Sequence, residues 1–376
     1  DNQRCFTLAA ADFARVNPNT GTAPIFKTRR DAELTTAIYR NASVLIDRSC
    51  GTEVMAWPVR YATMFHMTND SGLFRTRQEL DEREGAYPIG GNHFKSKSGE
   101  WLPLYVGRMI HQFDHRAASV VVNEENIHNA AFSGEVTLAE KQDPDFTPEP
   151  QYWVAEQEVE FPAGFEWAIA FRDIARATDV RTIIASVVPK AGFGNKLPLL
   201  LPTDAAAYKS AGPLMLANLN ALPFDFVARS KIHSTSVNWY LAEQLSVIPL
   251  ERYSSTRFGK KTAALVVSES VLELTYTSSD MAPFARDLGY VDKKGEVKPP
   301  FKWDEERWLE LRAKLDAAYF HLYGITDRED VRYIYSTFPI VEREDTEKYG
   351  RYKSRDLCLA WMSALAAGDP DAKIKL

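Results

Sequence analysis

Apolar residues in this chain occur in short runs, and proline, glycine or charge interrupts each run long before it could cross a membrane. A bilayer requires about 20 consecutive apolar residues, whereas runs such as 182–188 and 197–201 are far shorter. The polar start at Asp1 also lacks the basic and then apolar stretches of a secretory signal. The sequence therefore predicts a cytoplasmic protein with no membrane partner.

The spacing of the apolar residues predicts a mixed α+β fold. Short apolar stretches alternate with turns across 52–122, and the β-branched run 182–188 is typical of a buried strand. Helical spacing marks 29–40, 205–222, 236–245 and 261–274. It is clearest in 303–323, where Trp308 and Leu315 belong to an apolar stripe that we expect to be buried.

We therefore predict two mixed lobes of sheet and helix with a helical C-terminal tail. The Pro- and Asp/Glu-rich segment 143–150 is expected to be the loop between the lobes. The expected units are connector helices at 1–51, a first lobe at 52–150, a second lobe at 151–262 and the tail at 263–376.

Charge is unevenly distributed along the chain. The net charge of -6 argues against a protein that coats nucleic acid without selectivity. Residues 187–262 nevertheless carry nine Lys or Arg against four Asp or Glu, so a phosphate backbone would be expected there. The three cysteines are too far apart in the sequence for a disulfide framework or a paired zinc site.

Six blocks in a fixed order carry a resemblance to one family. The blocks are 17–33, 64–71, 104–116, 182–198, 224–245 and 311–352. Together they resemble the region that follows the catalytic domain in large adenine-specific DNA methyltransferases, namely type IIG restriction-modification enzymes and related phage-defence methyltransferases. The fifth block is also similar to the specificity subunits of type I restriction systems. The resemblance implies target recognition on double-stranded DNA.

The resemblance also implies methyl transfer from S-adenosylmethionine to the amino group of adenine, but the residues for that chemistry are missing. A flipped adenine requires an Asn-Pro-Pro-aromatic motif, and the nearest string, Asn17-Pro18-Asn19-Thr20, fits a turn instead. The glycines of 191–195 do not lie between a strand and a helix, as a nucleotide cradle requires. We therefore expect no catalytic residue and no cofactor in this chain, with S-adenosylmethionine bound by a catalytic domain outside it.

The block 108–116 combines hydrogen-bonding side chains with aromatic residues. Arg and Gln can read guanine and adenine in the major groove, but the same residues could equally form a buried polar network that braces the fold. His111 and His115 would share a face only on a helix, and no metal site is expected. The candidates for base reading or for the scaffold are Arg108, His111, Gln112, Asp114, His115 and Arg116.

The second group of candidates lies in the basic region. Serine and threonine hydroxyls before a predicted helix, with lysine and arginine nearby, suit a phosphate oxygen; the alternative is an ordinary helix cap with solvated charges. The expected phosphate contacts are Arg229, Lys231, Ser234, Thr235, Lys190 and Lys196.

The resulting expectation is a DNA-recognition module whose methyltransferase domain lies in the same chain or in a partner chain. A sequence that begins at Asp1 without a Met favours a fragment. One alternative is the DNA-binding subunit of a split methyltransferase, active only with its partner. The other is a structural subunit that contacts other proteins of a defence complex. An upstream reading frame with Asn-Pro-Pro-aromatic would favour the fragment, and a start codon would favour the split enzyme.

Overall fold

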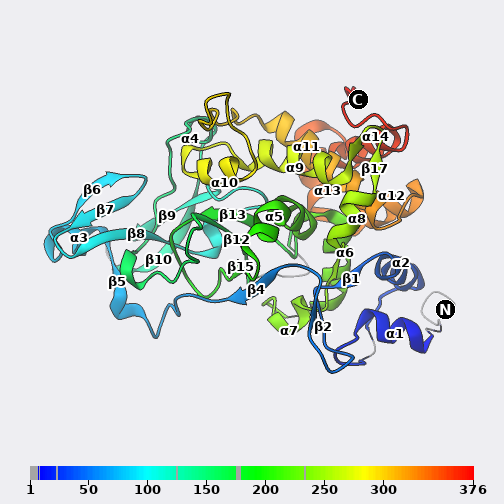
Figure 1. Cartoon of the computed structure of the whole chain (residues 1–376), viewed down its shortest axis with the longest axis horizontal. Coiled ribbons are helices and arrows are strands. Elements are labelled where there is room, and N and C mark those ends of the chain that lie inside the picture. Colours follow the sequence, from blue (N-terminus) through cyan, green and yellow to red (C-terminus); the bar gives the residue numbers. More distant parts are fainter. Residues whose placement is uncertain (1–6, 8, 23, 124–125, 175–178, 233) are drawn as a thin grey trace.

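The computed structural model describes residues 7, 9–22, 24–123, 126–174, 179–232 and 234–376, with side chains throughout these ranges except 122–132. Antiparallel sheets occupy much of residues 43–202, and helices dominate from residue 205 onward. Figure 1 shows a sheet arm at one end of the molecule and the C-terminal helices at the other. The predicted mixed α+β fold with a helical tail is confirmed.

A four-stranded antiparallel sheet forms the centre, in the order β13-β12-β15-β4. Its strands are β4 (Val59–Ala62), β12 (Trp167–Phe171), β13 (Ala185–Pro189) and β15 (Leu199–Pro202). Every residue of β12 is buried because both faces of the sheet are covered. Trp167 and Ile169 pack into the large helical core, whereas Ala168 and Ala170 face a smaller apolar cluster.

A second sheet runs in the order β5-β11-β8-β7-β6, with β14 paired parallel to β8. Its strands are β5 (Phe74–Arg75), β6 (Tyr87–Gly90), β7 (His93–Ser96), β8 (Gly99–Tyr105), β11 (Trp153–Ala155) and β14 (Gly192–Phe193). Strands β6 and β7, with helix α3 (Arg77–Glu82), form the projecting arm (Figure 1).

The predicted boundary at residue 150 does not separate the sheets, because strands from both sides of it pair within each sheet. Strand β4 pairs with β15, and β8 pairs with β11 and β14. The segments 52–150 and 151–262 therefore share their strands, because hydrogen bonding between distant strands decides which segments fold together.

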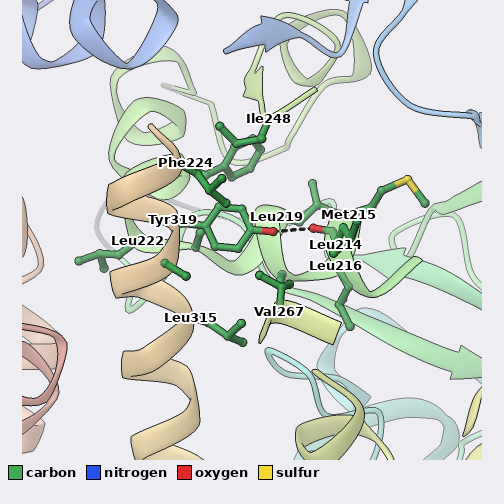
Figure 2. Packing of buried hydrophobic residues seen from close by; sticks show 14 of the residues in the cluster. Leu214, Met215, Leu216, Leu219, Leu222, Phe224, Ile248, Val267, Leu315 and Tyr319 are labelled. Carbon is green, nitrogen blue, oxygen red and sulfur yellow. Dashed lines mark hydrogen bonds between the residues drawn. The ribbon is translucent and has the colours of Figure 1, made fainter. Parts of the chain in front are cut away.

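Helices cover one face of the central sheet and enclose the main core. They include α5 (Ala205–Asn220), α6 (Leu222–Lys231) and α9 (Ala263–Thr275). The ring of Trp167 packs so close to α5 that a Cβ on Gly212 would lie 2.7 Å from it, which explains the glycine in this helix. Figure 2 shows Tyr319 of helix α11 donating its hydroxyl to the carbonyl of Leu214, at 2.7 Å.

The predicted C-terminal tail consists of helices α11 (Glu305–Leu322), α12 (Arg328–Ser336), α13 (Pro339–Tyr349) and α14 (Lys353–Ala366). Leu315 is 2% exposed, as predicted, whereas Trp308 is only partly buried. Helix α11 is buried on almost all sides from Leu311 onward, because α9 packs on it as well as α14. Burial of this helix therefore extends well beyond the apolar stripe.

The N-terminal helices are α1 (Ala10–Val16) and α2 (Arg29–Arg40). Helix α2 begins where predicted, because the Thr28 hydroxyl accepts from the Asp31 N–H while the Asp31 carboxylate accepts from the Thr28 N–H. Two short strands follow helix α2, namely β1 (Ser43–Val44), which pairs with β16 (Ser246–Val247), and β2 (Ile46–Asp47).

The remaining elements are short or peripheral. They are β3 (Val54–Met55), β9 (Ala118–Asn123), β10 (Asn126–Glu135), α4 (Leu138–Gln142), α7 (Trp239–Ala242), α8 (Leu250–Ser255), β17 (Arg257–Phe258), β18 (Lys261–Thr262) and α10 (Ala282–Asp287). Within the described ranges, no helix is both long enough and apolar enough to span a bilayer.

Candidate functional site

The block 108–116 makes a tight reversal of the chain and is not a helix. Phe113 adopts a positive φ of 61°, and the His111 N–H donates to the Asp114 carbonyl at 2.7 Å. His111 and His115 therefore do not share a helical face. No group of three candidate metal ligands occurs among the described residues.

Arg116 is completely buried and binds backbone oxygens instead of solvent. Its guanidinium donates to four carbonyls at 2.8–3.1 Å. These belong to Asp143, Phe146, Lys141 and Thr277. Arg116 thereby fixes the loop after α4 and the end of α9 to the start of β9.

Two further pairs brace the same region. Asp114 forms a buried ion pair with Lys141. Burial by itself would raise the pKa of the Asp114 carboxyl, but the charge and hydrogen bond of Lys141 and the hydrogen bond from the Arg116 N–H together lower it. His115 Nε2 lies 2.9 Å from a carboxylate oxygen of Asp280. These contacts favour the scaffold over base reading for Asp114, His115 and Arg116.

Gln112 is also fully engaged inside the protein. It is 1% exposed; its amide N–H donates to the Asn220 carbonyl at 3.0 Å, and its oxygen accepts from Arg312 at 2.6 Å. An amide bonded in this way has no edge left for an adenine. Within this block, Arg108 remains exposed and His111 remains partly exposed.

The structure places Arg229 against the protein interior rather than at a phosphate site. Its guanidinium donates to the carbonyls of Thr337 at 3.1 Å and Val180 at 3.0 Å, and lies 4.1 Å from the centre of the Phe338 ring. It also lies 3.6 Å from the carboxylate of Asp225. A DNA phosphate would have to displace these partners.

The Lys231 ammonium is likewise bound by groups of the protein itself. Its ammonium donates to the carbonyls of Val16 and Gln244, both at 2.6 Å, and lies 4.8 Å from the centre of the Tyr39 ring. Burial lowers the pKa of Lys231 to about 7. Lys231 thus joins α6 to the N-terminal helices, and the expected phosphate site at Arg229 and Lys231 is corrected to a structural one.

Ser234 and Thr235 are exposed but do not cap a helix. The helix expected at 236–245 is reduced to α7, which begins after Asn238, so the expected serine and threonine cap is wrong. The chain beyond α7 instead forms β16 against β1. The hydroxyl of Ser234 donates to the Ser236 carbonyl at 2.6 Å.

The two remaining lysines lie in different surroundings. Lys190 pairs with Glu156 at 2.6 Å, next to a hollow of about 560 Å³ lined by several carboxylates. Lys196 pairs with Asp173 at 2.6 Å, and 49% of its side chain stays exposed. The two lysines therefore pair with different carboxylates, Glu156 for Lys190 and Asp173 for Lys196.

Hydrogen bonds bring several loops together around Lys196. The Asn195 N–H donates to the Phe65 carbonyl at 2.7 Å, and the Asp173 N–H donates to the Lys196 carbonyl at 3.1 Å. A Cβ on Gly107 would lie 3.2 Å from the same Lys196 carbonyl. The loops 63–70, 106–109 and 194–196 are therefore direct neighbours.

The segment 234–240 completes this surface. The Val237 N–H donates to the Asp173 carbonyl at 2.7 Å, and the ring of Trp239 stacks on Tyr61 of β4 with 4.5 Å between centres. Figure 1 accordingly shows α7 beside β4. Seven of the exposed polar residues on these loops, called the loop surface below, are His66, Thr68, Asn69, Arg108, Lys196, Ser234 and Thr235.

Positive charge on the loop surface is accessible. Among the described residues, none forms an ion pair or hydrogen bond with the side chain of Arg108, which lies on the 3-10 turn η2 (Gly107–Met109). Sequence reasoning assigned no contact to His66, Thr68 or Asn69. The only available signal was that they belong to one of the six blocks.

The glycines considered for a cofactor cradle are instead required by packing. A Cβ on Gly192 would lie 2.5 Å from Val154, and one on Gly194 would lie 2.9 Å from the Met67 sulfur. Both glycines are buried. These residues do not fit S-adenosylmethionine, and no chemical step through that cofactor follows for this chain.

No protein-family model matches the chain, and no curated protein matches its sequence.

Proposed function

We propose that this chain is the DNA target-recognition region of an adenine-specific DNA methyltransferase of the restriction or phage-defence type. In this proposal the chain binds double-stranded DNA, and a catalytic domain in the same or a partner chain binds S-adenosylmethionine and transfers the methyl group. The loop surface is the part of the chain that contacts DNA.

One observation carries the proposal. Residues from four of the six resemblance blocks, far apart in the sequence, meet at the loop surface: 64–71, 104–116, 182–198 and 224–245. Loops that converge on one exposed surface, with a free guanidinium, an ammonium, an amide and hydroxyls, offer the groups that bind phosphates and base edges.

The test is duplex binding measured by fluorescence anisotropy at several salt concentrations. Replacing Arg108→Gln together with Lys196→Gln should lower the affinity and reduce the slope of log affinity against log salt by roughly 0.9 for each phosphate that is no longer neutralised. The matched control is Lys293→Gln with Lys294→Gln, which removes two exposed charges from a distant turn and should change neither quantity. An unchanged slope for the first double variant would reject the loop surface as the DNA-binding surface.

A second measurement concerns the cofactor. Calorimetric titration of the chain with S-adenosylmethionine should show no saturable binding, since neither the adenine motif nor a glycine cradle is present in this sequence. Saturable binding at micromolar concentration would show that this chain itself binds the cofactor. It would contradict the proposal that a separate catalytic domain binds S-adenosylmethionine.

A further inference from the structure

The projecting arm contains a hollow of about 540 Å³ between helix α3, the strands β6 and β7, and the chain at β11. Three apolar and three charged residues of its lining are Pro88, Phe94, Trp153, Arg77, Asp81 and Glu149. A hollow of this size, with an apolar wall and a few polar groups, is typical of a site for a small organic ligand.

Helix α3 is held in a fixed position beside this hollow. Its first turn is closed by a capping box, because the Thr76 hydroxyl accepts from the Glu79 N–H while the Glu79 carboxylate accepts from the Thr76 N–H at 2.9 Å. Leu80 is fully buried in the aromatic cluster under the helix. Arg77 and Asp81 are four residues apart, so they lie on one face of α3, and both line the hollow.

The guanidinium of Arg77 offers a flat polar surface. It lies 4.4 Å from the centre of the Phe94 ring, and 57% of the Arg77 side chain remains exposed. Within the described part of the chain Arg77 makes no side-chain hydrogen bond, and its ion pair with Glu149 is long, at 3.7 Å. One face of the guanidinium thus covers the ring, while the side chain stays open to a planar ligand that stacks on it.

Asp81 provides an unused hydrogen-bond acceptor next to this surface. Its side chain is exposed and has neither a hydrogen bond nor an ion pair with any described residue. Glu149 already lies at the guanidinium of Arg77. An ionised carboxylate can only accept hydrogen bonds, so Asp81 favours a ligand that brings an N–H donor.

Two other hollows of similar size hold their arginines differently. In the hollow of about 670 Å³ between α2 and α12, Arg30 donates to Asp330 at 3.0 Å. In the acidic hollow of about 560 Å³ described above, Arg75 donates to Glu84 at 2.8 Å. Arg77 forms no such bond in the described ranges, so the hollow of the arm is the best suited of the three to a planar ligand.

We propose that the hollow of the arm binds a nucleobase that carries an exocyclic amino group. The base stacks on the guanidinium of Arg77, and its amino group donates to the carboxylate of Asp81, as cytosine does to acidic side chains. A base with a carbonyl oxygen at that position is repelled by the carboxylate. A lysine or arginine side chain as the ligand is disfavoured, because it would place a second cation against Arg77.

The site itself is tested with free nucleosides and the whole chain. Saturation-transfer NMR titrations compare cytidine with uridine, which carry an amino group and a carbonyl oxygen at the same ring position. Cytidine should bind saturably and at least about fivefold more tightly than uridine, because only cytidine offers a donor to Asp81. Equal affinities, or no saturable binding of cytidine, would overturn the proposal.

Two variants assign the roles of the two side chains. Arg77→Lys keeps the charge but removes the flat guanidinium, so it should weaken cytidine binding by at least about fivefold. Asp81→Asn should abolish most of the preference for cytidine over uridine, because its amide can donate to the uridine oxygen as well as accept from the cytidine amino group. Unchanged binding in Arg77→Lys, or an unchanged preference in Asp81→Asn, would contradict the assigned role.

Matched controls on the same helix separate binding from a change in the arm. Arg83→Lys and Glu82→Gln alter exposed residues at the end of α3 that are not part of the hollow, and both should keep the affinity and the preference of the parent. Melting temperatures show whether each variant is folded. If Arg83→Lys weakens cytidine binding as much as Arg77→Lys does, the loss is a general effect on the arm and the site is overturned.

Duplex binding identifies the source of the base. Only the use of the hollow for an unpaired base of DNA rests on the proposed function. Fluorescence anisotropy compares a duplex that has one unpaired cytosine with the same duplex fully paired. The parent should prefer the duplex with the unpaired cytosine, and Arg77→Lys should lose this preference.

The possible failures are distinguishable. If cytidine binds as proposed but the parent shows no preference between the two duplexes, the assignment to DNA is overturned and the ligand is a free nucleoside or nucleotide. If the chain binds no duplex at all, the proposed function fails, whereas the cytidine titrations with Arg77→Lys and Asp81→Asn still decide whether the site exists.

Discussion

The segment 229–231 and the loop surface both carry positive side chains, but they use them for different purposes. Arg229 and Lys231 direct their charges inward to carbonyl oxygens of distant segments. Arg108 and Lys196 lie on loops at the surface, where the side chains remain largely exposed. The comparison teaches that a local excess of lysine and arginine does not locate a phosphate site. The decisive property is whether the protein's own backbone has already engaged the charge.

The largest expected effect separates an engaged arginine from a free one. Arg116→Met removes four hydrogen bonds to backbone carbonyls, two of them buried, and should lower the free energy of unfolding by about 4 kcal/mol. Arg108→Met should change it by no more than about 0.5 kcal/mol. Urea denaturation of both variants measures the difference, and comparable losses would contradict the contrast between the two arginines.

The next effect depends on pH. The Lys231 ammonium has a pKa of about 7 in the folded state and 10.5 when unperturbed, so the unfolded state binds more protons between these values. The stability of the parent relative to Lys231→Met should therefore rise by about 2 kcal/mol from pH 7 to pH 9. This gain is lost as pH falls back from 9 to 7, and the difference levels off below the folded-state pKa. Denaturation of both proteins across this range gives the difference. A constant difference would show that Lys231 keeps an ordinary pKa and is open to solvent.

A smaller effect decides between scaffold and base reading at Gln112. Gln112→Ala removes the bonds to Asn220 and Arg312 and should cost about 1.5 kcal/mol of stability, with no change in the preferred DNA sequence. Thermal melting and competition binding with duplexes altered at single base pairs measure the two quantities. If Gln112→Ala instead weakens the preference for one base pair by about 1–3 kcal/mol, Gln112 contacts DNA and reads that base pair.

The smallest effect distinguishes the two exposed lysines. Lys190→Ala removes a partly exposed ion pair with Glu156 and should cost less than about 1 kcal/mol, with no change in the salt slope of duplex binding. Lys196→Ala should reduce that slope. Equal slopes for the two variants would remove the distinction between Lys196 and other surface lysines.

Elements whose signals are local could be predicted from the sequence. Helix α2 was predicted by its helical spacing of apolar residues, and α11 by its apolar stripe. Helix α7 is shorter than predicted because the carbonyls of Glu243 and Leu245 accept from the N–H groups of Ile46 and Leu45, partners that no local pattern reveals. The site was less predictable for the same reason: the Arg229 partner Thr337 and the Arg172 partner Ile110 are distant in sequence.

The shared strands have a consequence for how this chain is made. Strand β4 can complete its pairing only when β15 has been synthesised, and β1 must wait for Val247. Pairing across such sequence separations is slow, because loop-closure entropy opposes it until the partner arrives. The first 200 residues thus leave the ribosome with open strand edges, and we expect them to depend on chaperones until α5 and the later helices cover the sheet.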